Sequence, residues 1–99
     1  MTANRDWHVR RTGGLLPPGF EKRFSEDGAS GTTYFMGVPI GSFDVRAAGE
    51  NEGVELVYRA WPIVDVLAHP PGDGDSIEST GNVSVGGRRL RFCRFRLER

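Results

Sequence analysis

Asp65 is the residue whose type and position most clearly invite chemistry. It stands between Val64 and Val66, in a segment that is otherwise apolar from Ile63 to Leu67. A carboxylate in such company lies either on a solvated face or in the interior with a partner, because an unpaired buried charge is costly. A buried Asp65 would take Arg94 or Arg96 as its partner, and a paired structural acid is favoured over a catalytic one. Catalysis would need a second titratable group in the same pocket.

The densest run of charge is a series of arginines near the carboxyl-terminal end: Arg88, Arg89, Arg91, Arg94, Arg96 and Arg99. Arginines along one strand can bind a phosphate or a carboxylate bidentately. Residues 65–78, however, contain Asp65, Asp73, Asp75 and Glu78 and no Lys or Arg. Pairing between the two runs across neighbouring strands is therefore the favoured interpretation, an anionic ligand is the second, and nucleic acid is the third.

Aromatic residues form the third candidate set, and they are expected in the interior of a small barrel: Tyr34, Phe35, Phe43, Tyr58, Trp61, Phe92 and Phe95. The interior of an eight-stranded barrel is either filled by side chains or hollow enough to hold one small ligand. The filled interior is favoured. Together these sets predict six ligand-binding residues: Tyr34, Tyr58, Trp61, Asp65, Arg94 and Arg96.

The remaining reactive residues show no catalytic or metal-binding pattern. His8 and His69 are far apart and lack the spacing of metal ligands, and Cys93 is the only cysteine. The glycines of residues 81–87 precede no helix signal, so they do not form a phosphate loop. The sequence therefore predicts no metal, no cofactor and no catalytic residue that can be named.

Composition describes one small domain over residues 1–99, with residues 1–6 expected to be disordered. Thirteen basic residues balance thirteen acidic ones, whereas nucleic-acid binding favours a basic excess. No stretch approaches the ~20 apolar residues of a membrane helix, and the amino-terminal end has no signal-peptide pattern. The expectations are no nucleic-acid partner, no membrane partner and a cytoplasmic location.

Fourteen glycines and six prolines are so evenly scattered that the sequence favours strands over helices. Alternating, β-branched and aromatic segments predict eight strands, at residues 7–12, 20–25, 32–36, 42–47, 54–61, 63–67, 76–85 and 88–98. In the last strand, Leu90 and Phe92 alternate out of phase with Cys93, Phe95 and Leu97, so a β-bulge near Cys93 or Arg94 is expected. The predicted fold is all-β: an antiparallel meander of seven or eight short strands that forms a barrel, a half-barrel or a sandwich.

Two stretches resemble the carboxyl-terminal domain of an uncharacterised bacterial family known for a Gly-x-Trp-x-Gly segment. They are ELVYRAWPIVDVL, with Tyr58, Pro62 and Asp65, and the ending FCRFRLER; PPGFEKRF is similar to a third family segment through Lys22, Arg23 and Phe24. The Gly-x-Trp-x-Gly segment itself is absent, and the match covers about half of the chain. The resemblance implies a small, lipocalin-like β domain and no particular reaction.

These observations lead to a ranked set of functions. The first is a non-enzymatic small barrel that binds a small apolar or weakly anionic molecule. The second is a protein-protein interaction module or a homodimer without a small-molecule ligand. The third is a small hydrolase or isomerase that uses Asp65 with His69 or an arginine.

Overall fold

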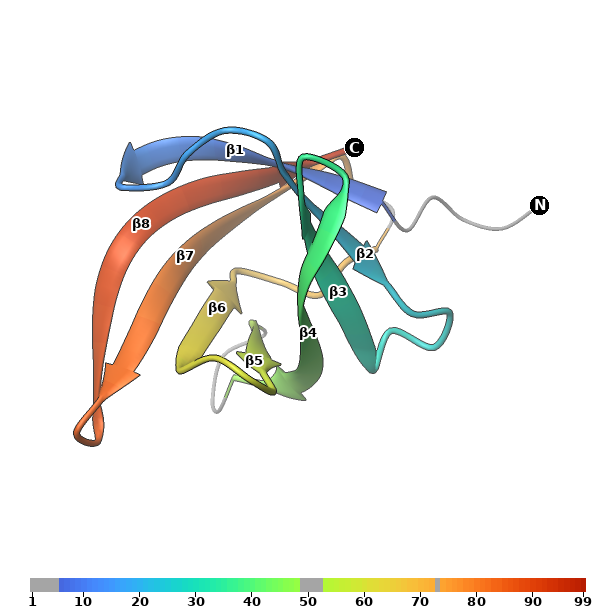
Figure 1. The fold of residues 1–99 in the computed structure, drawn as a ribbon. Coiled ribbons are helices and arrows are strands. Elements are labelled where there is room, and N and C mark those ends of the chain that lie inside the picture. Colours follow the sequence, from blue (N-terminus) through green and yellow to red (C-terminus); the bar gives the residue numbers. More distant parts are fainter. Residues whose placement is uncertain (1–5, 49–52, 73) are drawn as a thin grey trace.

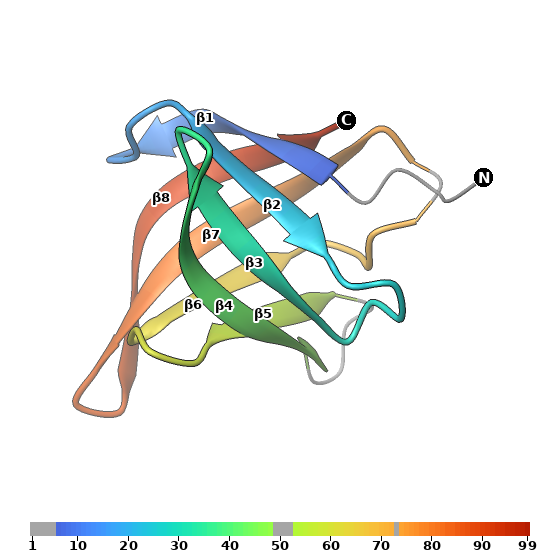
Figure 2. The ribbon, with the colours of Figure 1, turned by 45° about the vertical axis from the view of Figure 1, so that its right-hand side comes forward.

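Eight antiparallel strands close into a barrel in the computed structural model (Figures 1 and 2). The structure describes residues 6–48, 53–72 and 74–99. The strands are β1 (Asp6–Gly14), β2 (Phe20–Phe24), β3 (Ser30–Phe35), β4 (Val38–Ala47), β5 (Val54–Tyr58), β6 (Ile63–Leu67), β7 (Ser76–Val85) and β8 (Arg88–Glu98). Each strand pairs with the next one along the chain, and β8 closes the barrel on β1. The all-β meander is therefore confirmed, and of the three architectures left open it is the closed barrel.

The described ranges contain no helix, and so no helix that is long and apolar enough to cross a membrane. The expectation of disorder over residues 1–6 lies outside the described residues except at Asp6, where β1 begins. Asp6 pairs with Arg23 of β2 in the strand register and accepts a hydrogen bond of 2.8 Å from its guanidinium.

Two strand boundaries differ from the sequence prediction by three residues or more. β4 starts at Val38, because a bulge at Ile40 keeps residues 38–41, which the sequence prediction left outside the strands, paired with β3. β5 ends at Tyr58 instead of Trp61. Pro62 has no backbone N–H to donate, and Trp61 turns back so that its indole N–H donates to the Ile40 carbonyl at 3.1 Å.

The predicted bulge in β8 is confirmed at Phe92. Gly81 of β7 pairs with Cys93, while the next residue, Asn82, pairs with Arg91, so Phe92 is the extra residue. The extra residue changes the alternation phase, and Phe92 and Cys93 both face the interior as cavity-lining residues. The whole apolar set of β8 can thus serve one face.

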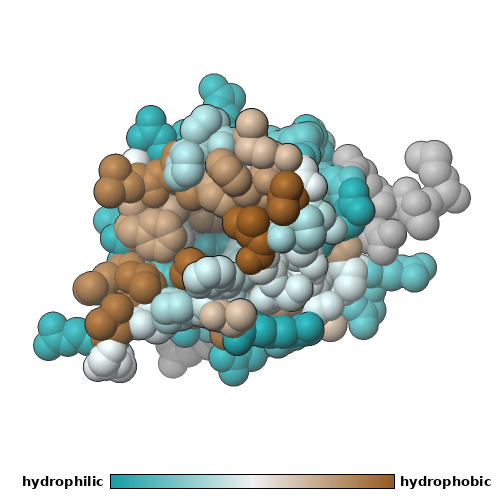
Figure 3. Space-filling model, viewed as in Figure 1, coloured by the Kyte–Doolittle hydropathy of each residue, from teal (hydrophilic) through white to brown (hydrophobic). Residues whose placement is uncertain are grey.

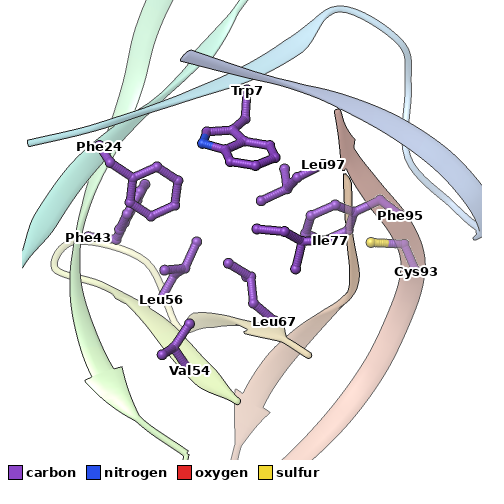
Figure 4. Packing of buried hydrophobic residues seen from close by; sticks show 10 residues of the cluster. All are labelled: Trp7, Phe24, Phe43, Val54, Leu56, Leu67, Ile77, Cys93, Phe95 and Leu97. Atoms are coloured by element: carbon purple, nitrogen blue, oxygen red, sulfur yellow. The ribbon is translucent and has the colours of Figure 1, made fainter. Parts of the chain in front are cut away.

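One end of the barrel is filled by a compact core (Figure 4). Its side chains come from seven of the strands and point toward one another: Trp7, Phe24, Phe43, Val54, Leu56, Leu67, Ile77, Cys93, Phe95 and Leu97. Gly31 permits the close approach of β3, because a Cβ atom there would lie 2.5 Å from the Phe43 ring and 2.6 Å from the Arg23 carbonyl oxygen. This core holds the far end of the barrel shut.

Ion pairs tie neighbouring strands on the outer surface. Arg96 of β8 binds Glu78 of β7 at 2.9 Å, as cross-strand pairing of the two charge runs predicts. Arg89 instead reaches Glu55 at 2.5 Å. The arginines on the outer surface therefore pair with acidic residues both inside and outside residues 65–78.

The connections divide between two ends of the barrel. The turns that join β1 to β2, β3 to β4, β5 to β6 and β7 to β8 lie together on the left of Figure 2, and the turn that joins β2 to β3 lies on the right. We call the first end the open end, because the interior there is hollow.

Candidate functional site

A cavity of about 350 Å³ occupies the open end of the barrel. Its size falls within the ~300–1,000 Å³ typical of small-molecule sites. The lining is apolar apart from four polar side chains, and it consists of Val9, Leu15, Leu16, Pro17, Phe20, Lys22, Thr33, Ile40, Gly41, Tyr58, Trp61, Ile63, Asp65, Phe92, Cys93 and Phe95. Figure 3 shows the hollow on the face turned toward the viewer, with hydrophobic residues around it. The expectation of a fully filled interior is therefore wrong.

The four polar side chains form one buried cluster. The Lys22 ammonium lies 2.8 Å from Asp65 Oδ2 and donates to Thr33 Oγ1 at 2.9 Å and to Tyr58 Oη at 2.6 Å. Tyr58 Oη donates to Asp65 Oδ2 at 3.0 Å, and the Thr33 and Tyr58 hydroxyls are hydrogen-bonded to each other. The three donors of Lys22 are thus used within the cluster.

The cluster lies between the cavity and the core. Lys22 and Asp65 line the cavity, yet only 4% and 5% of their surfaces are exposed. The Lys22 ammonium is also 5.7 Å from the centre of the Phe43 ring and 5.6 Å from that of the Phe95 ring, both in the core. The cluster therefore forms a polar floor beneath an apolar chamber.

Electrostatics keep this floor neutral overall. Burial disfavours the Lys22 ammonium, but the Asp65 carboxylate and Tyr58 outweigh burial and raise the pKa of Lys22 above its ordinary value. Burial also raises the pKa of the Tyr58 phenol. At neutral pH Lys22 is accordingly an ammonium and Tyr58 a neutral phenol.

One oxygen of the cluster keeps a free position. Both contacts of Asp65 within the cluster use Oδ2, and Oδ1 accepts no hydrogen bond from the residues that the structure describes. Within the same residues, no fully enclosed side-chain nitrogen or oxygen lacks a partner. Oδ1 therefore retains access to the cavity, where it offers an acceptor to any group that can donate.

The structure brings together three of the six residues predicted to bind a ligand: Tyr58, Trp61 and Asp65 all line the cavity. Trp61 stands at its mouth with 54% of its surface exposed. Asp65 is buried and paired, which is the second of the two placements that its apolar neighbours allowed.

The other three predicted residues do not line this cavity. Tyr34 follows the inward Thr33 and lies on the outer surface, where the Arg23 guanidinium is 5.5 Å from its ring centre. Arg94 and Arg96 alternate with the inward Cys93 and Phe95, so they project outward. The expectation that one of them pairs with Asp65 is wrong, because the partner is Lys22.

Lys22 and Thr33 are the polar residues that the sequence prediction missed. A signal for Lys22 was present: it alternates in phase with Phe20 and Phe24, and it is the only lysine beside twelve arginines. An inward-facing basic residue on β2 could have been inferred from that phase. Thr33 carries no comparable signal, since threonine is common on either face of a strand.

Two chemistries weighed from the sequence lack their partners here. His69 is exposed, and its ring nitrogen Nδ1 lies 3.1 Å from the Pro70 carbonyl oxygen, so it does not join Asp65. Among the described residues, no three His, Cys, Asp or Glu side chains are grouped as metal ligands. The arrangement is suited to enclosing an apolar molecule and hydrogen-bonding one polar end of it.

Fold and cavity together define a class of protein: a small closed antiparallel barrel with one filled end, one hollow end and a buried Lys22–Asp65 pair between them. Comparison of the chain with protein-family profiles, curated proteins and solved structures gives no match. The resemblance to the Gly-x-Trp-x-Gly family therefore stays a prediction.

Proposed function

We propose that this barrel binds one small, predominantly apolar molecule in the cavity at its open end. The observation that carries the proposal is the apolar chamber that ends on a neutral polar floor. Apolar walls with a few placed polar groups are the usual composition of a small-molecule site. Eight-stranded up-and-down barrels also include carriers that hold one ligand in this position.

The polar floor favours an uncharged ligand with a hydrogen-bond donor. Lys22 is neutralised by Asp65 and has no donor left over, so an anionic end group would gain little there. Asp65 Oδ1, by contrast, can accept a hydrogen bond from a hydroxyl or N–H group. A hydrogen bond to a charged group contributes about 1.5–3 kcal/mol. Of the two ligand types expected from the sequence, this supports the apolar one over the weakly anionic one.

Titration with N-phenyl-1-naphthylamine tests the proposal, because this fluorophore is apolar, uncharged and carries one N–H group. We expect saturable binding of one molecule per chain, with displacement by decanol at lower concentration than by decanoate. Val9→Phe fills part of the cavity and should weaken binding at least tenfold. Val57→Phe is the matched control, since the same substitution adds the same volume on the outer face of β5.

Two results would contradict the proposal. One is a wild-type chain that is folded by circular dichroism and does not bind the fluorophore. The other is binding that Val9→Phe leaves as strong as Val57→Phe does.

A further inference from the structure

The exposed large hydrophobic residues are concentrated at the open end. Within the described part of the chain they are Leu15, Met36, Val38, Ile40, Trp61, Val85 and Leu90, and we call this set the apolar rim. Each lies in, or within three residues of, one of the four turns at that end. Their exposed fractions run from 42% to 83%, although an ordinary soluble surface scatters such residues singly.

Charge is also distributed unevenly between the two ends. The four segments that form the open end, residues 12–20, 34–40, 58–63 and 83–91, contain Arg59, Arg88, Arg89 and Arg91 and no Asp or Glu. The whole chain is nevertheless neutral. The open end is therefore both apolar and basic, whereas acidic residues such as Glu26, Asp27 and Asp75 lie at the other end.

Two of these four arginines have no ion-pair partner among the residues that the structure describes. Arg59 pairs with Asp44 at 2.7 Å, and Arg89 pairs with Glu55. Arg88 and Arg91 are exposed, and neither has an ion-pair partner among the residues that the structure describes. Arg91 follows Leu90 directly and Arg88 lies two residues before it in the β7–β8 hairpin, so both unpaired arginines lie close to an exposed apolar side chain.

We propose that the open end docks on an anionic phospholipid bilayer surface. The side chains of the apolar rim would enter the boundary between headgroups and acyl chains, while Arg88 and Arg91 would contact lipid phosphates. Charge complementarity favours this occupant over a second copy of the chain. Two open ends placed face to face would oppose basic segments that contain no acidic residue.

Docking in this orientation has a consequence for the cavity. Leu15, Ile40 and Trp61 belong both to the apolar rim and to the cavity lining. A bilayer in contact with the rim would therefore face the cavity mouth directly, and an apolar ligand could exchange with the lipid phase without crossing water. The docking itself rests on the rim and its charge, and it does not require the cavity to bind a ligand.

Co-sedimentation with vesicles tests the docking. We expect the chain to bind vesicles of phosphatidylcholine mixed with phosphatidylserine, and to bind vesicles of phosphatidylcholine alone much more weakly. Trp61 should report the contact by a blue shift of its emission, because Trp7, the other tryptophan, is already 1% exposed. Raised salt should weaken the binding.

Variants separate the contribution of the arginines from that of the apolar rim. Arg88→Gln/Arg91→Gln should lower the partition coefficient about thirtyfold, at about fivefold for each basic residue near an anionic surface. Arg10→Gln/Arg46→Gln removes the same charge from strands outside the rim and should lower it less than threefold, a bound set by the screening of distant charges. Val85→Ser/Leu90→Ser should abolish the blue shift of Trp61 and leave N-phenyl-1-naphthylamine binding intact, since neither residue lines the cavity.

Three results would overturn the proposal. The first is a wild-type chain that does not sediment with anionic vesicles. The second is equal loss of binding in the two double-arginine variants. The third is a dimer in sedimentation velocity that Val85→Ser/Leu90→Ser dissociates, because a second copy would then cover the rim.

Discussion

Replacement of Lys22 by methionine should be among the most damaging single substitutions in the barrel. The change keeps most of the side-chain volume and removes the ammonium from a site that is 4% exposed. It leaves the Asp65 carboxylate buried with only the Tyr58 hydroxyl as a donor. Removal of one partner from a buried ion pair costs about 3–5 kcal/mol. A domain of this size has roughly 5–15 kcal/mol of unfolding free energy in total.

A double-mutant cycle gives this prediction its discriminating power. Asp65→Leu should also cost about 3–5 kcal/mol, because it leaves the Lys22 ammonium buried without its counter-ion. The double variant Lys22→Met/Asp65→Leu removes both charges, and the Thr33 and Tyr58 hydroxyls can still bond to each other. Its cost should therefore be within about 1–2 kcal/mol of zero, far below the sum of the two single costs.

Urea unfolding monitored by tryptophan fluorescence measures all four corners of the cycle. The core residue Trp7 moves from a buried to a solvated environment on unfolding, so its emission reports the transition. The reasoning is refuted if either single variant loses less than about 1 kcal/mol, or if the double variant loses as much as the two singles together.

Three further predictions follow from the buried groups. Lys22 and Tyr58 both have raised pKa values in the folded chain, so their contribution to stability is complete below about pH 10 and is lost as the pH rises beyond it. The urea midpoint of the wild type should therefore be level from pH 7 to 9 and then fall. In Lys22→Met/Asp65→Leu, which lacks the Lys22 ammonium, it should fall less steeply. Gly31→Ala should destabilise the barrel by about 1–3 kcal/mol through the clash with Phe43, whereas Gly74→Ala, which meets nothing within 4 Å, should leave the urea midpoint unchanged. Burial raises the pKa of the Cys93 thiol, so Ellman's reagent at pH 8 should react only after urea is added, and rapid reaction of the native chain would contradict the placement of Cys93.

The fold was largely predictable because alternation is a direct record of which face a strand buries. The eight strands follow from that pattern, and the phase change between Phe92 and Cys93 predicts the bulge in β8. Closure was not predictable in the same way. Whether β8 pairs with β1 depends on strand tilt and stagger around the whole sheet, which no local segment encodes.

The candidate site was predictable only in part. Asp65 was recognisable as a charge in an apolar strand, and its burial follows from that context. The prediction that Arg94 or Arg96 is its partner is wrong. Phase places both arginines outside and Lys22 inside, in line with Phe20 and Phe24. The hollow could not be inferred, since the same aromatic residues can fill a barrel or line a cavity.

Native mass spectrometry of the purified chain, before and after incubation with an equimolar mixture of apolar alcohols, tests the central claim most directly. The claim predicts a complex of one chain with one small molecule in the wild type and in Val57→Phe, and a strongly reduced complex in Val9→Phe. A wild-type spectrum that contains only the bare chain after incubation, or a small-molecule complex that Val9→Phe retains in full, would contradict it.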